Sequence, residues 1–335
     1  MRIGIFGLKG HQSVVFQGAR ELGGCQIVAV SDDDPQKLRK FCEQEPLARE
    51  AESYANAAHL IEHAMLDLCV VCDENGLRAE QLLALLARDI HVVTEKPLAT
   101  TLADLQRLRE AFARSKSKLT MLLTMRHEPK YGAVRKLVQD GAIGNVCQVT
   151  TQKSYRVEER DAWQKSRQRL GGTIPFIGIH SLDMVRWTTG LDFTHIAAFH
   201  GNGGTPYLGE TEDQASILAR LTNGASVTAR LDYLRPSTMP THGDDRLRIA
   251  GSDGIIEVRS DLHDSQLVTR QHGPREIKAE PVENFFVSFV RSIRNGTPQV
   301  IPPDDCFSIT EIVLRARDAA DGMQMVALET RKNEG

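Results

Sequence analysis

The regular alternation of short apolar segments with amphipathic ones constrains the fold of this chain more than any other feature. The segments between the apolar ones predict helices near 35–44, 56–64, 77–89 and 102–116. Strands are predicted at RIGIFG (2–7), QIVAVSD (26–32), LDLCVVC (66–72), HVVTE (91–95) and LTMLLTM (119–125). Strand and helix in succession are typical of a parallel, doubly wound sheet. We therefore expect an α/β domain over residues 1–124.

The pattern changes after residue 126 and predicts a second domain over residues 125–335. Two segments read as hairpins, 212–234 around Asn223-Gly224 and 246–260 around Asp253-Gly254, because apolar residues alternate on both sides of each turn. The charged run 157–169 is expected to be an exposed loop. Helices are predicted at 130–140, 285–296 and 306–322. These elements favour an α+β domain with a mostly antiparallel open sheet, whose C-terminal helix packs back on the first domain.

Length and composition exclude several classes of protein. The 335 residues suit two domains, and 41% hydrophobic with 25% charged residues is ordinary for a globular chain. A net charge of −3 argues against a nucleic-acid surface, and no apolar run has the length of a membrane span. Six cysteines are too few for a disulfide framework, and the strand expected from residue 2 leaves no room for a secretory signal. We therefore expect a cytoplasmic protein.

The segment GLKGHQ (7–12) joins the first strand to the first helix, which is where a dinucleotide fold holds its pyrophosphate. Against the pattern G-x-G-x-x-G, Gly7 fits the first position. Lys9 and Gln12 stand at the second and third, with Gly10 as an extra glycine between them. The alternative interpretation is a strand–turn–helix connection that binds no ligand.

Asp32 ends the second strand and strengthens the nucleotide interpretation. A carboxylate there can accept hydrogen bonds from an adenosine ribose and would repel a 2′-phosphate, which favours NAD over NADP. The alternative is a capping cluster, since Asp32, Asp33 and Asp34 precede Pro35 at a predicted helix start. Both interpretations hold if Asp34 caps the helix while Asp32 binds.

Two short patterns resemble metal or redox motifs but do not predict such a site. HLIEH (59–63) fits H-x-x-E-H but has no third ligand in view, so we interpret it as a solvated helix face. CVVC (69–72) lies in a predicted strand, where residues three apart point to opposite faces and cannot share a metal ion or a disulfide. No metal site is therefore expected.

TEKPLA (94–99) places Lys96 at the carboxyl end of a predicted parallel strand, the edge where open α/β sheets bind ligands. This run resembles the Glu-Lys-Pro signature of the Gfo/Idh/MocA oxidoreductases. The resemblance extends upstream to residue 73, with Glu74 and Arg78 where the family usually has proline and histidine. TMRHEPKYGAVRKLVQDGAIGNV (124–146) and GGTIPFIGIHSLDMVRWTTG (171–190) also resemble family segments, the second being the helix with the catalytic histidine.

The resemblance implies a Rossmann domain and an NAD(P)-dependent dehydrogenase of a sugar, cyclitol or related polyol. His180 would be the general base that takes the hydroxyl proton, and Lys96 would assist at the reacting oxygen. It also implies a homodimer or homotetramer formed through the open sheet face. The residues expected to bind NAD are Gly7, Lys9, Gly10, His11, Asp32, Asp73, Asn75, Glu95 and Lys96.

One departure from the family pattern concerns the histidine helix. The family commonly has Asp-x-Gly-x-His, and this chain has Phe176-Ile177-Gly178-Ile179-His180. The lost carboxylate removes a hydrogen-bond acceptor and a negative charge near His180, which lowers the pKa expected for the imidazole. Asp183, three residues further on, shares a helical face with His180 and is a candidate to orient the ring.

The expected substrate contacts are Arg126, Tyr155, Trp163, Phe176 and Asp183, each of which has an ordinary structural alternative. The changed residue at 176 leaves three functions open. The first is an active polyol or sugar dehydrogenase. The second is a non-catalytic member of the family that senses a nucleotide or sugar. The third is a glycoside hydrolase or lyase of the same fold that recycles its NAD.

Overall fold

The computed structural model describes residues 1–156, 159–260, 264–279 and 281–330, and the chain forms two compact units. Unit 1 comprises Met1–Leu122 with Glu283–Thr310, and unit 2 comprises Leu123–Val282 with Glu311–Gly335. The first change of unit therefore falls beside the boundary expected at 124/125. The segment 283–310 returns to unit 1.

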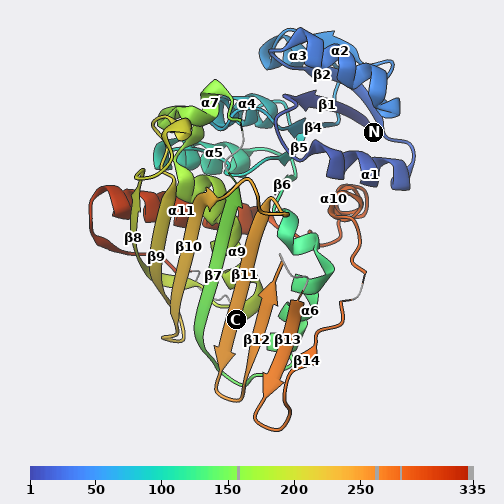
Figure 1. The fold of residues 1–335 in the computed structure, drawn as a ribbon. Helices are drawn as coiled ribbons and strands as arrows, with labels where there is room; N and C mark the ends of the chain where they lie inside the picture. Colours follow the sequence, from blue (N-terminus) through green and yellow to red (C-terminus); the bar gives the residue numbers. More distant parts are fainter. Residues whose placement is uncertain (157–158, 261–263, 280, 331–335) are drawn as a thin grey trace. The chain divides into compact units, whose positions relative to one another are not determined.

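Unit 1 contains a six-stranded sheet in the order β3-β2-β1-β4-β5-β6, with every pair parallel (Figure 1). Its strands are β1 (Arg2–Phe6), β2 (Gln26–Ser31), β3 (Glu52–Tyr54), β4 (Leu68–Val71), β5 (His91–Thr94) and β6 (Leu119–Met121). The helices are α1 (Gln12–Leu22), α2 (Pro35–Gln44), α3 (Ala57–His63), α4 (Asn75–Leu86), α5 (Leu102–Arg114) and α10 (Phe285–Asn295). The order reverses between β1 and β4, so the carboxyl ends of these two strands form the ligand edge of a Rossmann sheet.

The core of unit 1 includes a helix from far along the chain. Phe286 and Phe289 of α10 lie in one cluster with Val15 and Phe16 of α1. A Cβ on Gly18 of α1 would approach Phe286 Cβ to 2.9 Å, so the missing side chain lets the two helices meet closely.

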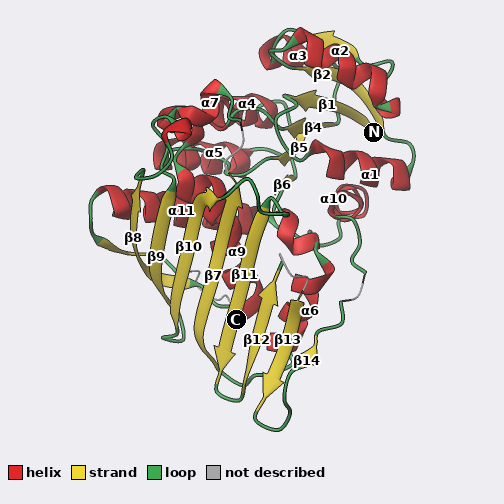
Figure 2. Ribbon diagram, in the orientation of Figure 1, coloured by secondary structure: helices red, strands yellow, loops and turns green. Residues whose placement is uncertain are grey.

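Unit 2 contains a nine-stranded sheet in the order β14-β13-β12-β11-β7-β10-β9-β8-β15 (Figure 2). Only β7 and β10 pair in parallel among these strands, which confirms the predicted mostly antiparallel sheet. The two predicted hairpins are β9–β10 and β11–β12. The strands are β7 (Val146–Arg156), β8 (Phe193–Gly201), β9 (Gln214–Leu221), β10 (Ser226–Arg235), β11 (Gly243–Gly251), β12 (Gly254–Arg259), β13 (Asp264–Thr269), β14 (Arg275–Glu276) and β15 (Met325–Ala327).

One face of this sheet carries helix α9, which holds His180. A π-helical turn, η3 (Ile174–Gly178), leads directly into α9 (Ile179–Thr189). A Cβ on Gly178 would lie 2.7 Å from Leu231 Cδ1, so the glycine allows the turn to sit against β10. The other helices are η2 (Thr124–His127), α6 (Pro129–Gln139), α7 (Ala162–Lys165), α8 (Arg167–Leu170) and α11 (Pro303–Asp321), the last beginning in unit 1.

The exposed loop predicted over 157–169 was wrong for the residues that the structure describes there. Residues 157 and 158 lie outside the described part. From Asp161 the chain forms α7 and α8, because Asp161 and Gln164 make a reciprocal capping box. Trp163 of α7 is only 5% exposed, so this charged segment has an apolar anchor. Within the described ranges, no helix is both long and apolar enough to cross a membrane.

Candidate active site

The turn after β1 depends on a glycine. Gly7 has a φ of +73°, in the left-handed region that L side chains avoid. A Cβ at this position would also lie 2.6 Å from Asp73 Cα at the end of β4. Lys9 N–H donates to the carbonyl of Cys72 at 2.9 Å, so the turn is attached to the neighbouring strand end.

Asp32 follows β2 directly and is buried. Its carboxylate accepts the N–H groups of Leu8 at 2.7 Å and Asp34 at 3.0 Å. Burial raises the pKa of Asp32, and the two backbone bonds oppose the rise. Asp34 accepts the N–H groups of Gln36 and Lys37 and caps α2. Asp34 therefore caps α2, as the capping interpretation predicts. Asp32 holds the turn after β1 at the edge of the sheet where the nucleotide interpretation places the ribose.

The Lys9 side chain joins three strand ends through carboxylates. Its Nζ lies 3.0 Å from Asp33, 3.1 Å from Asp73 and 3.4 Å from Glu74. Burial opposes the charge on Lys9, but the carboxylates outweigh burial and raise its pKa above the ordinary value. Lys9 therefore stays protonated, and the region around it keeps a net negative charge.

Glu95 lies against the start of α1. Its Oε1 accepts the His11 N–H at 2.6 Å and lies 2.6 Å from His11 Nδ1. A Cβ on Gly10 would meet the same carboxylate at 2.6 Å, which explains why the extra glycine is needed. Burial alone would raise the pKa of Glu95, but His11, with Lys96 and Arg78, outweighs burial and lowers the pKa to about 2.

Lys96 is buried after β5, and Arg78 braces the backbone beside it. The Arg78 guanidinium donates to the carbonyls of Pro97 and Asp73, both at 2.8 Å. It therefore ties the chain after β5 to the chain after β4. Asn75 is buried at the first position of α4. The arginine that replaces the family's histidine thus supports both the Lys96 segment and the Asp73 segment.

These residues fit a bound dinucleotide. The glycine turn leaves room for close backbone approach, an acid ends β2, and α1 begins without a side-chain cap or an acidic first turn. The N–H groups of Gly10 and His11 bond to Gln12 and Glu95. A pyrophosphate that accepted these N–H groups would therefore take the place of the side-chain oxygens of Gln12 and Glu95.

His180 in unit 2 is buried in the first turn of α9. The next residue, Ser181, has its Oγ 3.0 Å from Thr151 Oγ1 of β7, so the start of the helix is fixed to the sheet. This bond and the close approach of Gly178 to Leu231 fix the position and the rotation of the His180 helix on the sheet.

The predicted substrate residues Arg126 and Asp183 form a buried ion pair. Arg126 Nε lies 2.8 Å and its Nη2 2.5 Å from the two oxygens of Asp183, in a bidentate arrangement. Both side chains are 1% exposed, and the guanidinium also lies over the Trp187 ring at 5.8 Å. The pair attaches η2 to α9. Both oxygens of Asp183 accept from Arg126, and the role of Asp183 in orienting His180 stays a prediction.

Phe176 lies in an aromatic and cationic cluster. The Trp163 ring meets it edge-on with centroids 6.3 Å apart. The Arg160 guanidinium carbon lies 6.0 Å from the Phe176 ring and 4.5 Å from the Tyr233 ring. Tyr155 continues the cluster, 6.3 Å from Tyr233. Three of the five predicted substrate residues, Tyr155, Trp163 and Phe176, are thus connected through aromatic contacts and through the cation–π contacts of Arg160.

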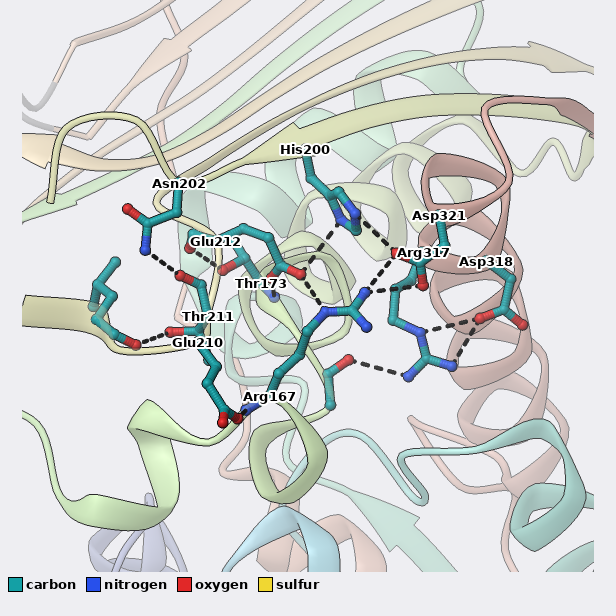
Figure 3. Close-up of polar contacts among 12 residues, drawn as sticks. Arg167, Thr173, His200, Asn202, Glu210, Thr211, Glu212, Arg317, Asp318 and Asp321 are labelled. Atoms are coloured by element: carbon teal, nitrogen blue, oxygen red, sulfur yellow. Dashed lines mark hydrogen bonds and ion pairs between the residues drawn. The ribbon is translucent and has the colours of Figure 1, made fainter. Parts of the chain in front are cut away.

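A polar network fixes the turn that precedes Phe176 (Figure 3). Glu212 Oε2 accepts the Thr173 N–H at 2.8 Å, while its Oε1 binds Arg167 Nε at 2.6 Å. Arg167 and His200 both reach Asp321 of α11, at 2.7 Å and 3.0 Å. Burial would raise the pKa of Glu212, but Arg167 and Thr173 lower it, so the carboxylate is ionised.

The segments HLIEH (59–63) and CVVC (69–72) lie on helix α3 and at the end of strand β4. His59 and His63 are on α3 with their rings in contact, and the described residues contain no cluster of three metal-ligating side chains. Cys69 and Cys72 are buried free thiols, and burial raises the pKa of both.

Four residues around these sites had no local signal in the sequence. Arg160 stood in a run interpreted as loop, and Lys153 in a strand where a lysine reads as exposed. Lys153 is in fact buried, with its Nζ 2.5 Å from Asp245. Arg78 was noted only as a departure. Glu212 acts on a turn almost forty residues earlier, and only its position beside a predicted strand was visible.

Comparison with known proteins identifies the family. Residues 1–123 match the model of an oxidoreductase family with an NAD-binding Rossmann fold, and residues 131–257 match the GFO/IDH/MocA C-terminal domain. The chain belongs to the Gfo/Idh/MocA oxidoreductase family. The predicted resemblance and the NAD cofactor are confirmed, and this Gfo/Idh/MocA chain is an enzyme of the dehydrogenase type.

Individual relatives align along most of the chain. A solved Thermotoga maritima protein, described no further than as an oxidoreductase, is 33% identical with a TM-score of 0.91, over 98% of this chain and 100% of its own. The myo-inositol 2-dehydrogenase of Thermotoga maritima is 23% identical over 98% of this chain and 99% of its own. The inositol 2-dehydrogenase of Pseudomonas fluorescens is 26% identical over 89% and 88%.

Proposed function

We propose that this enzyme oxidises a hydroxyl-bearing carbon of a sugar, cyclitol or related polyol. The similarity to two inositol dehydrogenases over nearly their whole length carries the substrate class. Bound NAD supplies a hydride acceptor for the C–H bond that breaks. His180 accepts the hydroxyl proton as general base, and Lys96 donates a hydrogen bond to the reacting oxygen.

NAD is proposed as the preferred cofactor over NADP. The turn residues Gly7, Gly10 and His11 would bind its pyrophosphate, and Asp32 its adenosine ribose. The carboxylates of Asp32 and Asp33 disfavour a 2′-phosphate by charge repulsion. Asp73, Asn75, Glu95 and Lys96 would border the nicotinamide half, with Lys9 as the cation that links the strand ends.

Within unit 2 we assign different roles to the predicted substrate residues. Tyr155, Trp163 and Phe176 are proposed to contact the substrate because they share one aromatic cluster. Arg126 and Asp183 are proposed as positioning residues, because they form an ion pair with each other. This pair holds α9, the helix that carries His180, in place.

Incubation with NAD and a panel of polyols, with NADH absorbance as readout, tests the activity. We expect NADH with at least one cyclitol or sugar. Calorimetrically measured NAD binding without any NADH formation would contradict the proposal and favour a non-catalytic sensor. Turnover of an NAD-containing preparation without added NAD would favour a hydrolase or lyase that recycles the cofactor.

A homodimer or homotetramer through the sheet of unit 2 is also proposed. Phe199, Leu218 and Met325 are 69%, 51% and 63% exposed. Ala197 pairs with both Leu218 and Met325, and Phe199 follows two residues later on the same face. Contiguous exposed apolar side chains mark interfaces. Leu218→Lys should lower the molar mass of the protein measured by light scattering. Met65→Lys, at an exposed methionine outside this sheet, should not.

A further inference from the structure

The residue at position 176 determines the charge that His180 has beside it. Phe176 and His180 are four residues apart across the junction of η3 and α9, so they lie on neighbouring turns of one helical face. Where the family pattern has a carboxylate, this chain has a phenyl ring with a guanidinium against it, at 6.0 Å. Position 176 therefore carries a phenyl ring with a cation against it where the family pattern has an anion.

Three carboxylates of this region are engaged with partners other than Arg160. Glu212 binds Arg167 and Thr173, and Asp245 binds Lys153. Asp161 caps α7 and accepts from the Trp163 ring nitrogen at 3.3 Å. Among the residues that the structure describes, none forms an ion pair with Arg160.

Arg160 also has a hydrogen-bond donor to offer. Its Nε is buried and has no acceptor within the described ranges. A buried donor without an acceptor is costly, and an anionic acceptor would relieve that cost. Tyr233 beneath it is buried, and burial raises the phenol pKa more than the guanidinium lowers it, so the hydroxyl stays neutral. The planar guanidinium, fixed on two rings, matches the geometry of a carboxylate.

We propose that the substrate is a sugar acid and that Arg160 binds its carboxylate. The proposal rests on the proposed function in taking His180 as the catalytic base. Phe176 and Tyr233 hold the guanidinium in place, and the carboxylate group that the family pattern places on the protein is here carried by the ligand. A neutral polyol bound in the same place would leave the Arg160 guanidinium without a counter-charge and its Nε–H without an anionic acceptor.

Pairs of ligands that differ only in a carboxylate test the inference. Binding of D-gluconate and D-glucitol, and of D-glucuronate and D-glucose, is measured by calorimetry on the NADH-loaded enzyme, with kcat/KM where turnover occurs. We expect the acid of at least one pair to bind about 10- to 100-fold more tightly than its neutral partner. Arg160→Gln should remove this preference, and Arg160→Lys should keep part of it. Lys165→Gln, which removes an exposed charge from the same segment, should keep all of it.

A substitution at Phe176 provides an independent test, which holds even where the Arg160 variants do not fold. Phe176→Asp would give Arg160 an internal partner and should abolish the preference for the acid while Tm stays near that of the parent. Equal binding of neutral and acidic partners, no binding of either acid, or a preference that survives Arg160→Gln would overturn the proposal. Arg160-dependent acid binding without NADH from any substrate would contradict only the proposed function. Polyol turnover without acid preference would contradict only this inference.

Discussion

The strand-end edge of unit 1 and the His180 region of unit 2 are held by different kinds of contact. At the strand ends, backbone N–H groups bind carboxylates, as with Leu8 on Asp32 and His11 on Glu95. Around His180, side chains meet side chains, as with Arg126 on Asp183 and Arg160 on Tyr233. A backbone site tolerates many sequences if its glycines and acids remain, whereas a side-chain site changes whenever one partner changes.

The largest expected effect separates the chemistry from cofactor binding. His180→Ala should lower kcat by about 10²- to 10⁴-fold, because a general base contributes that much. The NAD affinity measured by calorimetry should stay close to that of the parent, since the residues proposed to bind the pyrophosphate and the adenosine ribose all belong to unit 1. Lys96→Ala should also lower kcat. His272→Ala, which removes an exposed histidine between β13 and β14, is the control and should leave kcat unaltered; full activity of His180→Ala would refute its role.

The next prediction tests the side-chain contacts around His180 through their effect on the free energy of unfolding. Arg126→Met leaves Asp183 buried without its partner and should lower the free energy of unfolding by about 3–5 kcal/mol. Lys136→Met breaks an exposed pair with Asp140 on α6 and should cost less than about 1 kcal/mol. Urea unfolding of both variants provides the comparison. Equal costs would mean that the Arg126–Asp183 pair does not hold η2 to α9.

The same difference explains how much the sequence could predict. The Rossmann sheet was predictable because buried strands are continuous apolar runs and Lys96 follows one of them directly. β3 was missed because two of its three residues are exposed. The π-helical turn had no signal, since it arises from packing of Gly178 on Leu231. Unit 2's hairpins were predictable from turn residues, but the order of its nine strands was not.

The candidate site divides in the same way. Gly7, Asp32 and Glu95 could be named as candidates because a position at a strand end is readable from the sequence. Arg160 and Glu212 could not, because their partners come from other elements and the contacts exist only after folding. Asp183 was found for its spacing to His180, yet its partner Arg126 comes from a different element. Local spacing identifies a residue, but not the atom to which it binds.

A pair of glycine substitutions tests the backbone kind of contact. Gly7→Ala and Gly24→Ala both put a side chain at positive φ, +73° and +63°, so each should cost about 1–2 kcal/mol of stability. Only at Gly7 does the added Cβ also meet Asp73, since nothing lies within 4 Å at Gly24. Gly7→Ala should therefore cost more stability than Gly24→Ala, and it should also weaken NAD binding by at least about tenfold, measured by calorimetry. Equal NAD affinities in the two variants would show that the turn does not approach the cofactor.

The last effect is a pH dependence at the junction of the turn and β5. The pKa of Glu95 falls from 4.5 to about 2 on folding. A depressed carboxyl pKa stabilises the fold above pH 4.5, and this contribution is lost as the pH falls towards 2. The parent should thus exceed Glu95→Gln in stability near neutrality, and the gap should shrink by about 2 kcal/mol between pH 5 and pH 3 in urea unfolding. Glu21→Gln, at an exposed carboxylate of α1, controls for general charge effects. A gap that stays constant with pH would mean that Glu95 holds His11 by shape and not by charge, and would weaken the contrast with unit 2.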